Sequence, residues 1–167
     1  YVGVQWHPER TKDLNIIAGI GSHLGFRAAT TAMCVQALIE EDDGSPEVAA
    51  AIDKGEAWLF DELPKVRRDN PMLIYNVWAH AYGIQALVAM HGRKPDDAAR
   101  RERIEGLIRG QYEKLEKYES AEGGWGYYDF KHGTQRPASS STSFVNAMVL
   151  VAFADARGIG VPPPEKI

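Results

Sequence analysis

MLIYNVWAHAYGIQALVAMH, residues 72–91, is the most apolar stretch of the chain. Asn76, His80 and Gln85 interrupt it, so we predict a helix buried in a protein core rather than a membrane span. Apolar residues lie on nearly all sides of this helix, and such a helix must be covered on every side. The stretch therefore predicts a central helix with neighbours packed around it.

Four further helices are predicted around this one, at about residues 26–41, 46–63, 95–120 and 141–157. Turn-forming residues such as DDGSP at 42–46 separate them. The first, third and fifth helices are apolar on most faces, whereas the second and fourth are amphipathic. This alternation predicts an all-α fold in which helical hairpins form an inner and an outer layer.

The predicted layering extends to single side chains. In the buried helices we expect four apolar side chains to be almost wholly covered, namely Ile84, Leu87, Met148 and Leu150. On the polar face of the fourth helix we expect three charged side chains to be exposed, namely Arg101, Glu105 and Glu113.

Two sequence features suggest repeated hairpins. QALI at 36–39 recurs as QALV at 85–88, a repeat of about fifty residues, and the turn GGWGYY at 123–128 precedes Ser/Thr-rich residues that open the last helix. These features resemble the repeat of the squalene–hopene cyclase and prenyltransferase superfamily, whose hairpins close into an α/α toroid. The resemblance covers about residues 25–167 and implies an incomplete toroid of about two and a half hairpins, preceded by an N-terminal extension at 1–24.

The catalytic motifs of that superfamily are absent from this chain. It has no Asp-x-Asp-Asp acid and no Asp-Asp-x-x-Asp diphosphate motif, and Cys34 lacks the companion Asp of a prenyltransferase zinc site. Cyclase and prenyltransferase chemistry are therefore disfavoured. We expect instead that an inner-wall cleft binds a small, partly apolar molecule, in a pocket formed by four aromatic residues: Tyr75, Trp78, Trp125 and Tyr128.

Three histidines suggest a second function. His23, His80 and His132 each precede an inner helix or lie early in it, so stacked hairpins would bring them to one rim. Together they would bind a divalent metal such as zinc, which activates water. Catalytic residues would then be His80, Asp129 and Tyr82, in a hydrolase of esters or phosphoesters that uses this metal or a His base. The simpler interpretation is that His80 is a hydrogen-bonded core residue and that the chain is a non-catalytic interaction repeat.

The first residues carry a separate resemblance. GVQWHPE at 3–9 is similar to the segment of class I glutamine amidotransferases that supplies the His and Glu of a Cys-His-Glu triad. The chain has no Gly-x-Cys-x-Gly nucleophile elbow, and Cys34 lies within a helical pattern. We therefore interpret the segment as a coincidence or a fusion remnant.

The composition of the chain disfavours some classes of binding partner. The net charge of −4, without a basic cluster, argues against nucleic acid. No signal peptide is visible, which favours the cytoplasm by default, although a chain that begins with Tyr1 is a processed product or a piece of a longer protein. The uncovered flanks of an incomplete toroid predict a homodimer, and residues 1–24 offer an alternative cover. Candidates for these flanks are Phe26, Met33, Phe144 and Val151.

Overall fold

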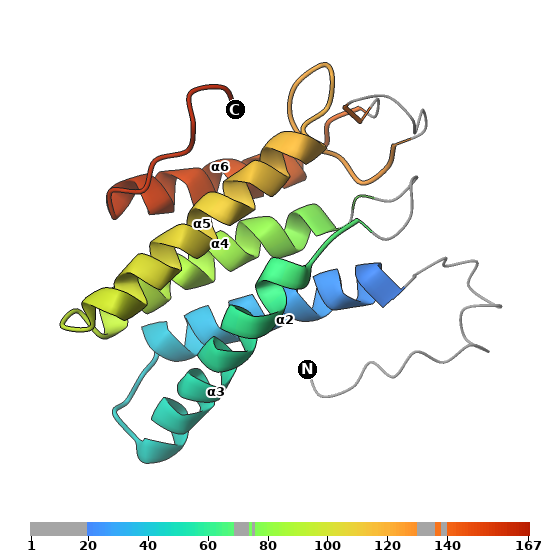
Figure 1. The fold of residues 1–167 in the computed structure, drawn as a ribbon. Helices are drawn as coiled ribbons and strands as arrows, with labels where there is room; N and C mark the ends of the chain where they lie inside the picture. Colours follow the sequence, from blue (N-terminus) through green and yellow to red (C-terminus); the bar gives the residue numbers. More distant parts are fainter. Residues whose placement is uncertain (1–19, 69–73, 75, 130–135, 138–139) are drawn as a thin grey trace, which may run out of the picture.

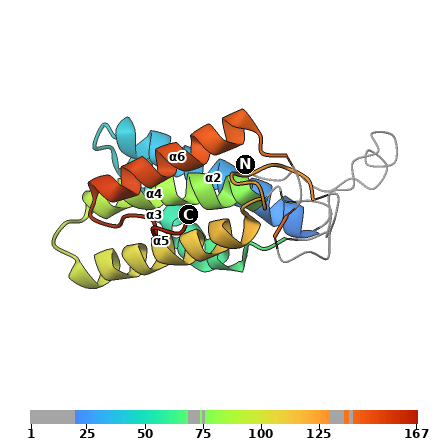
Figure 2. The same ribbon diagram turned by 90° about the horizontal axis from the view of Figure 1, so that it is seen from above.

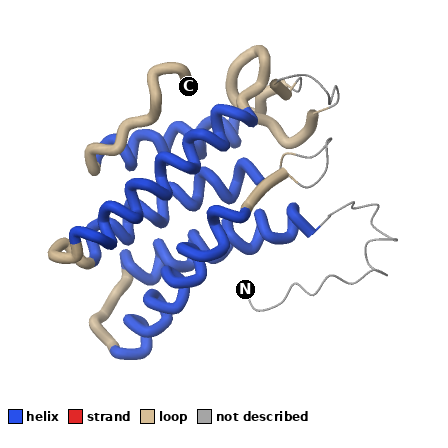
Figure 3. Tube along the Cα trace, in the orientation of Figure 1, coloured by secondary structure: helices blue, strands red, loops and turns tan. Residues whose placement is uncertain are grey.

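The computed structural model describes residues 20–68, 74, 76–129, 136–137 and 140–167. This part of the chain forms the five helices α2 (Ile20–Glu40), α3 (Pro46–Glu62), α4 (Asn76–Arg93), α5 (Ala98–Tyr118) and α6 (Ser143–Gly158). A short 3-10 turn, η1 (Leu63–Lys65), extends α3. No strand occurs among the described residues (Figure 3), so the predicted all-α class is confirmed.

The helices form two layers. α4 lies between α2 and α6, while α3 packs against α2 and α5 packs against α4. Figures 1 and 2 show α2, α4 and α6 side by side, with α3 and α5 on one side of them. We call α2, α4 and α6 the inner layer, and α3 and α5 the outer layer. The closure of such layers into a toroid stays a prediction.

Capping residues position the outer helices. The Ser45 hydroxyl accepts a hydrogen bond of 3.3 Å from the backbone N–H of Val48, and Pro46 occupies the first turn of α3. Asp97 caps α5 by accepting a hydrogen bond of 2.9 Å from the backbone N–H of Arg100. The starts of α3 and α5 lie within three residues of the predicted ones, because the capping chemistry is local and therefore readable from sequence.

The first helix begins earlier than predicted, at Ile20 rather than near Phe26. Glycines usually weaken a helix, and Gly25 lies in the first part of α2. Here α2 lies against α4, since a Cβ at Gly25 would be in ordinary van der Waals contact, 3.4 Å from the Cα of Asn76. The expected boundary between residues 24 and 25 consequently lies inside a helix.

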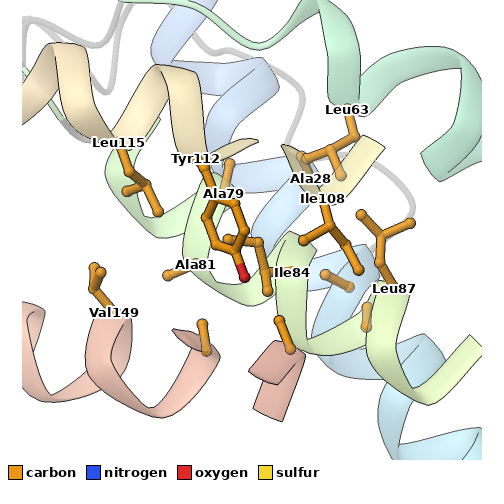
Figure 4. Close-up of a cluster of buried hydrophobic side chains, with 14 of the residues drawn as sticks. Ala28, Leu63, Ala79, Ala81, Ile84, Leu87, Ile108, Tyr112, Leu115 and Val149 are labelled. Atoms are coloured by element: carbon orange, nitrogen blue, oxygen red, sulfur yellow. The ribbon is translucent and has the colours of Figure 1, made fainter. Parts of the chain in front are cut away.

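The core fills the space between the layers (Figure 4). Ile84 and Leu87 of α4 are fully buried as predicted, together with Ile108 and Leu115 of α5. The prediction for Leu150 is wrong, because this side chain is 59% exposed. It lies on α6, the last helix of the inner layer, and no described element covers that flank.

The other burial predictions have mixed outcomes. Met148 is only partly buried, so near-complete burial was wrong for this residue as well. On α5, Glu113 is exposed as predicted, whereas Arg101 and Glu105 are half-buried. Glu105 accepts a hydrogen bond of 2.9 Å from Arg109 one turn later. The polar face of α5 is thus less open than its sequence indicates.

Candidate functional site

A buried polar network surrounds His80 on the side of α4 that faces the outer layer. The His80 side chain is fully buried, and its Nδ1 lies 2.8 Å from Oε1 of Gln111 on α5. Its Nε2 lies 3.2 Å from Nδ2 of Asn76, and the Tyr118 ring stacks on the imidazole at 5.9 Å. The network ties α4 to α5.

The hydrogen bonds define the proton positions of this network. Nε2 of Gln111 donates to the Leu107 carbonyl, which leaves its Oε1 to accept from His80. Nδ1 of His80 therefore carries the proton, and its Nε2 accepts from Asn76. Burial lowers the pKa of His80 from 6.5 to about 3, more than the bond to Gln111 raises it, and nearby Lys114 lowers it further. The imidazole is neutral, and both of its nitrogens are engaged.

The position of His80 affects the metal site predicted from His23, His80 and His132. For His80 to bind a metal or accept a proton, its Nε2 lone pair must first lose the Asn76 hydrogen bond. His23 lies on α2, where its Nε2 is buried and has no hydrogen-bond partner among the described residues, and His132 lies outside those residues. Within the described ranges, no three His, Cys, Asp or Glu side chains are grouped so that they would hold a metal ion. The zinc site that includes His132 stays a prediction.

The two other residues predicted to be catalytic are Asp129 and Tyr82. Asp129 is buried, and its carboxylate accepts a hydrogen bond of 2.9 Å from the guanidinium of Arg68. Tyr82 is two residues from His80 on α4, so its side chain projects from nearly the opposite side of the helix. The structure does not bring His80 and Tyr82 together around one reacting atom.

The opposite side of α4 carries a stripe of partly exposed residues. Trp78, Tyr82, Gln85 and Ala89 are spaced by four, three and four positions, so they share one face. This face looks away from the outer layer, because His80 and its neighbours on the other side contact α5. We call the surface of the inner layer along this stripe the open face.

Five aromatic side chains form a cluster at one end of the open face. Trp78 stacks on Tyr127 with ring centroids 5.8 Å apart and meets Tyr82 at 6.1 Å. Phe144 of α6 lies 5.4 Å from Tyr127 and 6.2 Å from Trp78, and Tyr128 completes the aromatic cluster against Tyr127 at 6.2 Å. Phe144 is 52% and Tyr128 is 39% exposed, so the cluster offers ring surface to solvent.

Tyr127 contacts three other rings of the aromatic cluster, those of Trp78, Tyr128 and Phe144. Partial burial raises the pKa of its phenol. The backbone carbonyl of Tyr127 accepts a hydrogen bond of 2.8 Å from the N–H of Ile74, just before α4. The cluster is therefore fixed to both the α4 and the α6 ends of the inner layer.

The predicted pocket is partly reproduced in this cluster. Trp78 and Tyr128 belong to it, whereas Tyr75 lies outside the described residues. Trp125 is instead buried against Phe153 and donates a hydrogen bond of 2.8 Å from its Nε1 to the Leu115 carbonyl, so it packs between helices. Sequence reasoning assigned Phe144 only to an uncovered flank. Its position in the first turn of an inner helix, as for Trp78, was the available signal.

A groove of about 590 Å³ lies farther along the same face. It is open to solvent and passes between the C-terminal parts of α2 and α6, above α4. Ten residues line it: Gln36, Ile39 and Glu40 from α2, Gln85, Val88 and Ala89 from α4, and Ala154, Asp155, Gly158 and Ile159 at the end of α6. The two glutamines are the first residues of the repeated QALI and QALV segments.

Comparison with protein-family models, with curated proteins and with solved structures gave no match for this chain. None of the helices in the described part of the chain has the length and apolar character needed to cross a membrane. The segment GVQWHPE, which resembles part of the amidotransferases, lies outside the described residues. The site must therefore be interpreted from its own geometry.

Proposed function

We propose that the chain is a segment of an incomplete α/α toroid whose open face binds a small, partly apolar molecule. The observation that carries this proposal is the aromatic cluster, in which Phe144 and Tyr128 expose ring surface beside the stacked pair of Trp78 and Tyr127. Aromatic rings with polar tips are typical of ligand pockets, since they combine a large apolar area with hydrogen-bonding groups.

The chemistry of the face supports binding rather than hydrolysis. His80, the strongest candidate for a base, is neutral and fully hydrogen-bonded on the opposite side of α4. Asp129 is held by Arg68. Along α4 the open face carries aromatic, aliphatic and amide side chains, Trp78, Tyr82, Gln85 and Ala89, which suit the packing of an apolar ligand and the positioning of a polar group.

Octanol tests this proposal, since it is small, neutral and partly apolar. Calorimetric titration of the purified chain should give saturable binding, and Phe144→Ser should weaken it about tenfold by removing apolar contact area. Leu150→Ser is the matched control, because Leu150 lies on the same helix and is similarly exposed but belongs neither to the aromatic cluster nor to the groove lining. Equal losses in the two variants, or no saturable binding to the parent chain, would contradict the proposal.

Self-association is a second candidate function, favoured by the exposed flank of α6. Leu150 is 59% exposed there, and Ala147 and Ala154, one turn before and after it, are also exposed. We propose that this flank pairs with a second copy of the chain, as two-fold dimers commonly do. Light scattering should then give about twice the chain mass of 18.5 kDa, and Leu150→Ser should halve it. A monomeric mass of the parent chain at high concentration would exclude the dimer.

A further inference from the structure

The groove at the far end of the open face carries an excess of negative charge. Glu40 on α2 and Asp155 on α6 line it from opposite walls, and none of its ten lining residues is Lys or Arg. Two helices also end there, α2 at Glu40 and α6 at Gly158. The C-terminal end of a helix carries partial negative charge, which adds to that of the carboxylates.

These carboxylates have no cationic partner within the described part of the chain. Asp155 is half-buried and makes no hydrogen bond or ion pair there. Glu40 accepts a single hydrogen bond of 2.9 Å, from the neutral amide of Gln36. A carboxylate in a groove gains from a cation that enters between the walls.

The remaining lining is apolar. Ile39, Val88 and Ile159 contribute aliphatic surface, and Gln85 connects the groove with the stripe that leads to the aromatic cluster. From Tyr82 to Ala89 the face extends about 10 Å along α4. A ligand with a positive end and an aliphatic chain would therefore place its charge between the carboxylates and its chain along α4 toward the aromatic rings.

We infer that the groove binds an organic cation, specifically a primary ammonium group on an aliphatic chain. This inference rests on the proposed function, because the chain of the ligand occupies the open face. It adds the charge of the ligand and the residues that select it, Glu40 and Asp155.

Octylammonium and octanol have the same chain length. Comparing their binding therefore separates the inferred preference for an ammonium group from the proposed binding of a partly apolar molecule. At pH 7 octylamine is protonated, as lysine is. Octylammonium should bind about tenfold more tightly than octanol, because each ion pair at a solvent-exposed site contributes modestly and two act together. This preference should shrink as salt is added. The double variant Glu40→Gln/Asp155→Asn should bind the two probes equally.

The matched control is Glu102→Gln/Glu113→Gln, which changes the net charge by the same amount on exposed positions of α5 in the outer layer. It should keep the tenfold preference. A preference lost equally in both double variants would overturn the inference, because it would reflect the overall charge of the protein. Equal binding of both probes to the parent chain would overturn the inference and leave the proposed function intact. If neither probe binds, both fail.

Discussion

The buried imidazole of His80 makes the stability of this protein depend on pH. In the unfolded chain this group has a pKa of 6.5, whereas burial lowers the pKa to about 3 in the folded state. As the pH falls below 6.5, the unfolded state binds a proton that the folded state does not bind. The folded state therefore loses stability as the pH falls from 6.5 toward 3, and this contribution is fully present above 6.5.

The magnitude follows from the two pKa values. Between pH 7 and pH 5 the unfolded imidazole changes from mostly neutral to almost fully protonated, while the folded one stays neutral. The free energy of unfolding should therefore fall by about 2 kcal/mol over this range because of His80 alone. If the free energy of unfolding changes with urea by about 2 kcal/mol per molar, the urea concentration at the unfolding midpoint should fall by about 1 M.

His80→Gln isolates this effect. The parent and the variant share all other ionisable groups, so subtracting the variant's change in unfolding free energy between pH 7 and pH 5 from that of the parent leaves the His80 contribution. A difference below about 0.5 kcal/mol would refute the reasoning. If the variant does not fold, nitrogen-15 NMR of the parent chain provides the same test. The His80 ring should stay neutral with its proton on Nδ1 at pH 5, and a titration above pH 5 would contradict the account.

Further predictions concern the packing between the layers. Gly83→Ala should destabilise the fold by about 1–3 kcal/mol in chemical denaturation, because the new Cβ would lie 2.8 Å from the buried Leu63 side chain. Gly106→Ala should instead stabilise the fold by about 0.5–1 kcal/mol, because a Cβ at this position on α5 would enter open space. If both variants changed the free energy of unfolding in the same direction, the result would contradict this packing. Glu56→Leu should cost about 3–5 kcal/mol, since it leaves the buried Arg100 guanidinium without the carboxylate it meets at 2.6 Å. The double variant Glu56→Leu/Arg100→Met should recover most of that loss, and no recovery would show that the ion pair is not the cause.

Much of the fold is readable from the sequence because its determinants are local. The caps at Ser45 and Asp97 and the all-round apolar character of α4 depend on residues a few positions apart. The early start of α2 is not readable in this way. The first part of α2 packs against the start of α4, where Gly25 lies near Asn76, and these segments are about fifty residues apart in the sequence.

The candidate site is less predictable, because it depends on the side of a helix that each residue occupies. His80 and Tyr82 are close in sequence, and both were assigned to one catalytic group. Helical geometry places His80 against the outer layer and Tyr82 on the open face. The repeated QALI and QALV segments, in contrast, indicated a shared environment, and Gln36 and Gln85 both line the groove.

The most direct test of the open face uses the tryptophan indole signals. The chain has four tryptophans: Trp6, which lies outside the described residues, Trp58 in the outer layer, Trp78 in the aromatic cluster, and the buried Trp125. In nitrogen-15 NMR spectra recorded during an octanol titration, we predict a saturable shift of the Trp78 indole N–H, with Trp58 and Trp125 unchanged. A shift at Trp58 with Trp78 unchanged would contradict the account, and so would the absence of any saturable shift.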